Sequence, residues 1–111
     1  MIQIIRTRAT EQQIDDMMLA LGTYIKIAVD VRRRVLAGGG ALHADCKAVL
    51  LDDGSQQQDI WGADWNPGSQ QLSYKSLINI RPHLENRSLV IQDSGVRERV
   101  REIAQTLLGE I

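Results

Sequence analysis

The sequence predicts an α+β fold, an antiparallel sheet of four to five strands with three helices packed mainly on one face. Apolar residues recur at helical spacing near the start and the end of the chain, whereas apolar and polar residues alternate in several stretches between them. The predicted order of elements is β-α-β-β-α-β-β-α. A length of 111 residues fits a single domain, residues 1–111.

The first strand and the first helix are predicted near the N-terminus. The run IQIIR, residues 2–6, is short and apolar and is typical of a strand. Thr10 and Gln13 have the spacing of a capping box, in which each side chain satisfies a backbone donor at a helix start. Gly22 stands where a helix cap is expected. Between them lies one apolar stripe, formed by Ile14, Met17, Met18 and Leu21.

Residues 24–40 fit two structures. Residues 25–31 alternate β-branched with other side chains, which is typical of a strand. Tyr24, Ala28, Val31 and Val35 also fit a helical stripe, so a helix stays open as the alternative. We favour a β-hairpin with its turn at Arg32-Arg33-Arg34, and we expect the three glycines at residues 38–40 to end its second strand.

The second half of the chain is predicted to contain another helix, a second hairpin and a final helix. The hairpin turn is Asn66-Pro67-Gly68-Ser69, which combines strong turn formers. Pro82 ends the return strand because proline cannot donate to a strand ladder. The predicted elements are a helix over residues 42–54, strands over residues 59–65 and 72–81, and a helix that begins at Asp93 or Ser94 with the stripe Val96, Val100, Ile103 and Leu107.

Composition limits the class of protein. The net charge of −1 argues against a general electrostatic attraction to nucleic acid or anionic membranes. No apolar run approaches the roughly 20 residues of a membrane span, and basic residues follow rather than precede the apolar run at the N-terminus. We therefore expect a cytoplasmic protein without signal peptide or anchor. Cys46 is the single cysteine, which excludes an internal disulfide, and no metal, cofactor or catalytic-triad spacing is present.

Polar residues at the far end of the second hairpin form the first candidate site. Asp59, Asp64, Asn79 and Arg81 lie on its two predicted strands. The planar guanidinium of Arg81 could bind a carboxylate or a phosphate there. The alternative is an internal ion pair of Arg81 with Asp59 or Asp64 that fixes the strand register.

Other residues could extend this site or stand apart from it. Asn86 and Arg87 follow Pro82 in a loop, where binding residues concentrate; the loop could equally be fixed by its own side chains. Trp61 is expected in the core of a chain that lacks phenylalanine, although tryptophan is also common in binding surfaces.

His43 and Asp45 form the second candidate. On a helix their side chains diverge by about 200°, so they share a ligand only if they precede the helix or lie at its first turn. In that case they could act as a ligand pair or an acid–base pair. The alternative is that Asp45 favours the helix start and His43 is an edge residue.

Several short motifs together resemble a known family. They are GALHAD at residues 40–45, QDIWG at 58–62, INIRP at 78–82 and NRS at 86–88. The chain resembles a family of small, uncharacterised prokaryotic proteins catalogued only as a domain of unknown function, from Tyr24 through the last helix. The resemblance implies a stand-alone domain and brings no activity, cofactor or catalytic residue. The family pattern usually has Asn in place of Asp64, and acidic or mixed residues in place of Arg32-Arg33-Arg34.

Three functional hypotheses follow. The first is a small non-catalytic binding or regulatory domain that recognises an anionic small molecule or a partner protein, and that forms a homodimer to cover an apolar sheet face. The second is a small hydrolase-like enzyme that uses His43 with Asp45 or Asp59, and Arg81 as a clamp. The third is weak nucleic-acid binding through Arg32-Arg33-Arg34. The candidate ligand-binding residues are His43, Asp45, Asp59, Trp61, Asn79, Arg81, Asn86 and Arg87.

Overall fold

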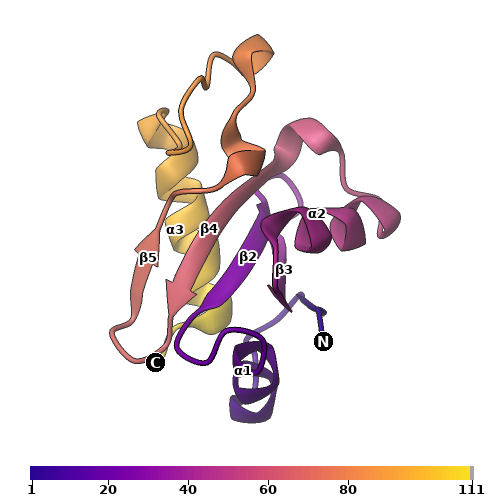
Figure 1. Cartoon of the computed structure of the whole chain (residues 1–111), viewed down its shortest axis with the longest axis vertical. Coiled ribbons are helices and arrows are strands. Elements are labelled where there is room, and N and C mark those ends of the chain that lie inside the picture. Colours follow the sequence, from indigo (N-terminus) through magenta and orange to yellow (C-terminus); the bar gives the residue numbers. More distant parts are fainter. Residues whose placement is uncertain (111) are drawn as a thin grey trace.

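The computed structural model describes residues 1–110 and confirms the α+β class and the predicted order of elements (Figure 1). The sheet has five strands in the order β1-β3-β2-β4-β5, and every neighbouring pair is antiparallel. The strands are β1 (Gln3–Ile5), β2 (Ile25–Asp30), β3 (Val35–Gly40), β4 (Ile60–Asn66) and β5 (Gln71–Ser73). The helices are α1 (Glu11–Met18), α2 (His43–Asp52) and α3 (Ser94–Leu108), with 3-10 turns at Gln57–Asp59, Leu77–Asn79 and Pro82–Leu84.

The hairpin interpretation of residues 24–40 is correct. Its turn forms without the usual Asn-Gly signal because the side chain of Asp30 takes over the role of a turn acceptor. Asp30 Oδ1 accepts from the backbone N–H groups of Arg32 and Arg33, both at 2.9 Å. Arg34 then adopts a left-handed conformation with a φ of 57° and leads into β3.

The three glycines form the last residues of β3, which ends at Gly40 as predicted. At Gly39 the strand register shifts and φ is +101°. A Cβ there would lie 2.5 Å from the carbonyl oxygen of Met1 and 3.1 Å from the Cα of Met17. The glycines thus allow the N-terminus and α1 to lie directly against this strand.

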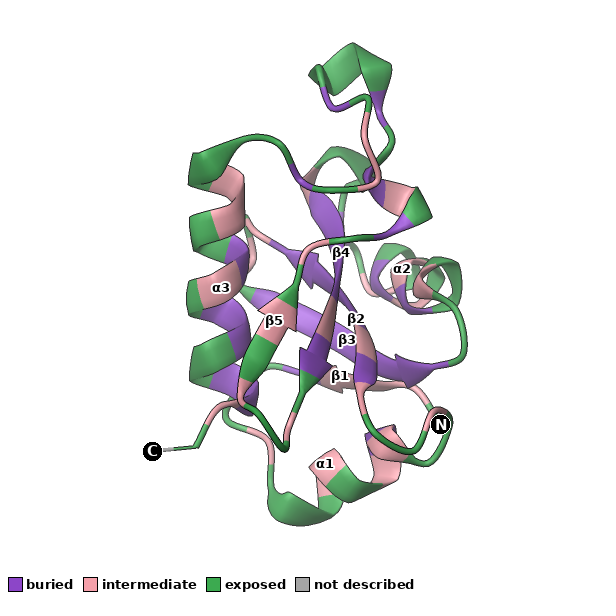
Figure 2. Cartoon of the chain, turned by 60° about the vertical axis from the view of Figure 1, so that its left-hand side comes forward, coloured by how far each residue is buried: buried purple, intermediate pink, exposed green. Residues whose placement is uncertain are grey.

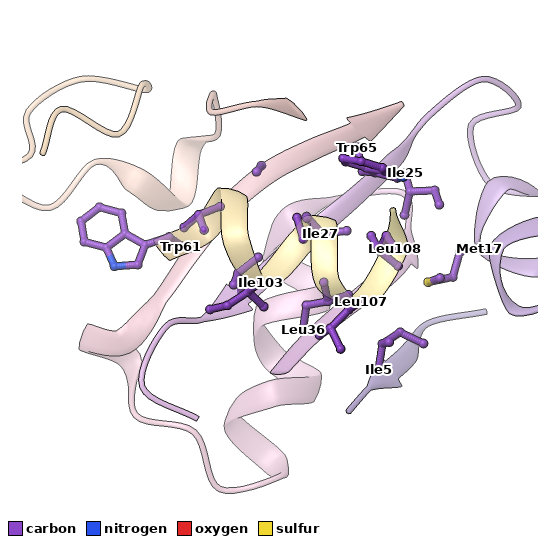
Figure 3. Packing of buried hydrophobic residues seen from close by; sticks show 14 of the residues in the cluster. Ile5, Met17, Ile25, Ile27, Leu36, Trp61, Trp65, Ile103, Leu107 and Leu108 are labelled. Carbon is purple, nitrogen blue, oxygen red and sulfur yellow. The ribbon is translucent and has the colours of Figure 1, made fainter. Parts of the chain in front are cut away.

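Two hydrophobic cores lie on opposite faces of the sheet. The larger contains both tryptophans and the apolar stripe of α3, and Figure 3 shows Trp61 at one end of it and Trp65 well apart from Trp61, beside Ile25. The smaller lies under α2 and includes Cys46 and Leu50. Burial raises the pKa of the Cys46 thiol, which disfavours the reactive thiolate form.

Two of the three helices therefore contribute to the core on one face of the sheet, and the third helix covers the other face. α3 and Met17 of α1 contribute to the larger core, whereas α2 packs on the opposite face (Figure 2). The homodimer was expected because one apolar sheet face would be left open. With α2 on that face, this reason for a dimer no longer applies.

The return strand of the second hairpin is shorter than predicted. β5 ends at Ser73, and a 3-10 turn at Leu77–Asn79 replaces the rest. Beyond β5, the side-chain amide of Asn79 bonds to both the N–H and the carbonyl of Gly62 in β4, at 2.8 and 3.0 Å. The side chain of Asn79 thus makes the bonds to β4 that a neighbouring strand would make. The backbone from Ser76 onward does not pair with β4 and forms turns instead.

Two predicted helix starts are confirmed. Thr10 and Gln13 form the reciprocal bonds of a capping box at α1, and Asp93 caps α3 by accepting from the N–H of Val96 at 3.0 Å. α1 is shorter than its apolar stripe suggested, since it ends at Met18. None of the helices within residues 1–110 has the length and apolar content that a bilayer span requires.

Candidate functional site

Arg81 is enclosed by the fold, and its side chain is almost completely buried. The residue is 3% exposed, and its Cζ lies 4.8 Å from the centroid of the Trp61 ring. Nε donates to the carbonyl of Ile78 at 3.0 Å, Nη1 to that of Gln57 at 2.9 Å, and Nη2 to that of Ile60. Burial lowers the pKa of this guanidinium. A ligand anion would have to displace these contacts to reach Arg81.

Asn79 and Asn86 are buried as well, and both bind backbone groups. Besides Gly62, the Nδ2 of Asn79 donates to the carbonyls of Tyr74 and Leu89, at 3.2 and 3.1 Å. Asn86 Nδ2 donates to the carbonyl of Asn79 at 2.8 Å. These two side-chain amides hold residues 74–90 against β4. Because they are bound to the backbone, they are not free to bind a ligand.

The other predicted residues lie apart from one another. Asp59 Oδ2 accepts from Arg32 Nε at 3.0 Å, and within residues 1–110 neither Asp59 nor Asp64 forms the predicted ion pair with Arg81. Asp45 is exposed in the first turn of α2, and Arg87 is exposed in the loop after the Pro82–Leu84 turn. The eight predicted residues therefore do not converge on one site.

The arginines of the first hairpin turn are paired within the chain. Arg33 Nη2 lies 2.7 Å from Asp53 Oδ2, and Arg6 lies 2.7 Å from Oδ1 of the same carboxylate. Hydrogen bonds from these two guanidinium groups hold the pKa of Asp53 at about 2, below its ordinary value of 3.8. Arg34 lies 3.8 Å from Glu102. These pairs reduce the positive charge that the turn could offer to a nucleic acid.

His43 has the geometry of an acid–base residue. Its side chain is 10% exposed, and Nε2 lies 2.8 Å from Asp64 Oδ1 and 2.9 Å from the carbonyl oxygen of Ala63. Both neighbours are acceptors, so Nε2 must hold the proton of the neutral ring. Nδ1 then bears the lone pair. No described residue bonds to Nδ1, and it is not among the fully buried unpaired atoms, so solvent reaches it.

A cavity of about 390 Å³ lies beside this histidine, between the start of α2 and the segment that follows β5. We call it the α2 pocket. Its volume is near the lower end of the range of about 300–1,000 Å³ that is typical of small-molecule sites. Residues from five parts of the chain line it, among them Lys26, Leu42, His43, Asp64, Lys75 and Leu77.

Charge and helix geometry make the α2 pocket suited to an anion. Lys26 and Lys75 form no ion pair with any residue in 1–110, and Asp64, the one carboxylate of the described lining, is occupied by His43. Leu42 is the N-cap residue of α2 and offers no side-chain bond to the first turn. Uncapped N–H groups at a helix start attract negative charge.

A larger hollow of about 480 Å³ lies elsewhere, between residues 8–15 and residues 108–110. None of the eight predicted residues lines it, whereas His43 lines the α2 pocket. Its lining also lacks a histidine. We therefore regard the α2 pocket as the candidate site.

The sequence pattern indicated His43 but not most of its neighbours in the α2 pocket. The patterns did not indicate Lys26, Lys75 or Leu77, and they indicated Asp64 only as a neighbour or ion-pair partner of Arg81. One available signal was Leu42, because an apolar N-cap residue breaks a strong local preference for Ser, Thr, Asp or Asn. Lys26 and Asp64 also face each other across β2 and β4, which only the strand register reveals.

No group of three or more metal-ligating side chains converges within residues 1–110. Comparisons with curated proteins and with solved structures gave no match. A family model described as a protein of unknown function (DUF5674) matches residues 3–107. That match spans nearly the whole chain, and the protein therefore belongs to this family of unknown function.

Proposed function

We propose that the protein is a small binding domain that recognises an anionic small molecule in the α2 pocket. The strongest support is the cavity of about 390 Å³, which is lined by His43 and two lysines. Neither lysine forms an ion pair with a residue in 1–110. This proposal keeps the predicted ligand class and changes the site. Lys26 and Lys75 take the place of Arg81, whose nitrogens donate to backbone carbonyls.

The test is a titration with sodium acetate and with sodium phosphate, followed by backbone amide shifts in NMR spectra. We expect shifts at residues 42–44 and 75–77 that saturate. A hydrogen bond to a charged group contributes about 1.5–3 kcal/mol, so Lys26→Gln or Lys75→Gln should weaken binding about tenfold or more.

Lys47→Gln is the matched control, because Lys47 is the remaining lysine of the chain and does not line the pocket. The proposal fails if neither anion shifts the pocket amides at millimolar concentrations. It also fails if Lys47→Gln weakens binding as much as Lys26→Gln.

The contact between His43 and Asp64 favours a second candidate function, acid–base catalysis on a bound ester. Nδ1 would remove a proton from a water molecule while the water oxygen bonds to the ester carbonyl carbon. The alcohol would leave, and the ring would return its proton. This is the hydrolase-like hypothesis with Asp64 in the place of Asp45 or Asp59, and with Asp64 as the residue that orients the ring.

Hydrolysis of p-nitrophenyl acetate tests this second candidate. If His43 is the base, His43→Gln should reduce the protein-dependent rate by about 10²-fold or more. His83→Gln is the control, because His83 is the other histidine and lies exposed in the Pro82–Leu84 turn. Equal rates for the two variants would rule out catalysis by His43.

A further inference from the structure

Part of the α2 pocket wall consists of leucines that the fold leaves exposed. Leu77 is 77% exposed and Leu42 is 56% exposed, although both line the same cavity. Ile78 and Leu89, which are partly buried, continue this wall. Leucines of a small domain normally lie in the core, so a set of them around one cavity indicates an apolar ligand surface.

Leu77 is held in this position by a rigid turn. Ser76 caps the Leu77–Asn79 turn, with its hydroxyl accepting from the N–H of Ile78 at 3.3 Å. Asn79 is fully buried and fixes the other end of the turn to Gly62. The backbone on both sides of Leu77 is therefore bound to the fold, and its exposure is not that of a loosely held loop residue.

We propose that the ligand of the α2 pocket is an unbranched aliphatic carboxylate. Its carboxylate lies beside Lys26 and Lys75, and its hydrocarbon chain lies across Leu42 and Leu77. This inference rests on the proposed function, because it takes the anion site as given and adds the chemistry of the rest of the ligand. Aliphatic walls and a small cavity fit a short flexible chain, and the two lysines outnumber Asp64, the one carboxylate of the described lining.

The test is a chain-length series: sodium acetate, butyrate, hexanoate and octanoate, titrated into the protein and followed by isothermal calorimetry and by amide shifts. Each buried methylene should tighten binding about fourfold, the equivalent of about 0.8 kcal/mol, until the cavity is full. Hexylamine, which has the same chain and the opposite charge, should bind far more weakly than hexanoate.

Substitutions distinguish the contribution of the ligand's hydrocarbon chain to binding from that of its carboxylate. Leu77→Ser should weaken hexanoate about fourfold or more and leave acetate unchanged. Leu19→Ser is the matched control, because Leu19 is 79% exposed and does not line the pocket. Lys26→Gln should weaken all four carboxylates by the same factor.

The outcomes distinguish this inference from the proposed function. If acetate and phosphate bind in a lysine-dependent way but affinity is independent of chain length, the anion site stands and the aliphatic ligand is refuted. If no carboxylate and no phosphate binds, both fail. Equal affinities for hexylamine and hexanoate would also overturn the inference. A dimer in sedimentation experiments that Leu77→Ser dissociates would overturn it too, since a second copy would then cover the leucines.

Discussion

At the scale of single residues, the polar side chains of residues 76–90 stabilise the fold by binding backbone groups. Asn79 offers one carbonyl and one amino group in a plane, which is the same donor and acceptor pair that a backbone peptide offers. It uses them to bind the N–H and the carbonyl of Gly62, with further bonds to Tyr74 and Leu89. A buried side chain with four backbone bonds should therefore contribute strongly to stability.

We predict that Asn79→Ala lowers the free energy of unfolding by about 3 kcal/mol, because it leaves several buried backbone groups without partners. Urea denaturation measures the change. Asn66→Ala is the control: Asn66 also accepts two backbone bonds, from Gly68 and Ser69, but in an exposed turn where water can replace it. That variant should lose about 1 kcal/mol or less. Similar losses for both variants would contradict the structural role of Asn79.

Residue types alone could indicate His43 but not its partners. Asp45 is close in sequence, yet both residues lie on α2, where side chains two positions apart diverge. Asp64 is 21 positions away and reaches His43 only because the first residue of α2 lies beside the last residues of β4. Such contacts depend on where the helix lies on the sheet, which local patterns do not specify.

At the scale of elements, local signals predicted most of the fold. The capping box of α1, the alternation in β2 and the stripe of α3 each depend on residues close in sequence, and all three are confirmed. β5 was predicted too long because the alternation of residues 72–81 continues past Ser73. The side chain of Asn79 competes with the backbone for the edge of β4, and no periodicity reveals that competition.

Leu42 at the start of α2 gives a prediction for one element. Leu42 is extended, with φ of −130° and ψ of 143°, and it bonds to no backbone group of the first turn through its side chain. We predict that Leu42→Ser raises the free energy of unfolding by about 1 kcal/mol, since a serine at this position caps the helix. Thermal and urea denaturation measure the gain.

Leu51→Ser is the control for this prediction, because it makes the same change inside the same helix. It should be destabilising by about 0.5 kcal/mol from helix propensity alone. The prediction is contradicted if Leu42→Ser is also destabilising. Under the inference above, Leu42→Ser should at the same time weaken hexanoate, so a gain in stability and a loss of affinity would occur together.

At the scale of the whole molecule, one carboxylate joins three distant parts of the chain. Asp53 follows α2, Arg6 follows β1, and Arg33 lies in the turn between β2 and β3. An acidic residue at a helix C-terminus is unfavourable by itself, because the carbonyl end of a helix is negative. The two guanidinium groups offset that repulsion, and they fix the hairpin turn and the first strand relative to α2.

We predict that this cluster contributes to the acid sensitivity of the fold. The pKa of Asp53 is about 2 in the folded chain and near its ordinary value of 3.8 in the unfolded one, so the unfolded state binds more protons between these values. The contribution of Asp53 is therefore fully present above about pH 5 and is lost as the pH falls toward 2.

Urea midpoints at a series of pH values should fall less steeply between pH 5 and 2 in Asp53→Asn than in the wild type. Asp52→Asn, which changes the exposed neighbour, should keep the wild-type slope. If Asp53→Asn instead keeps the wild-type slope, the two arginines do not stabilise the fold through this carboxylate.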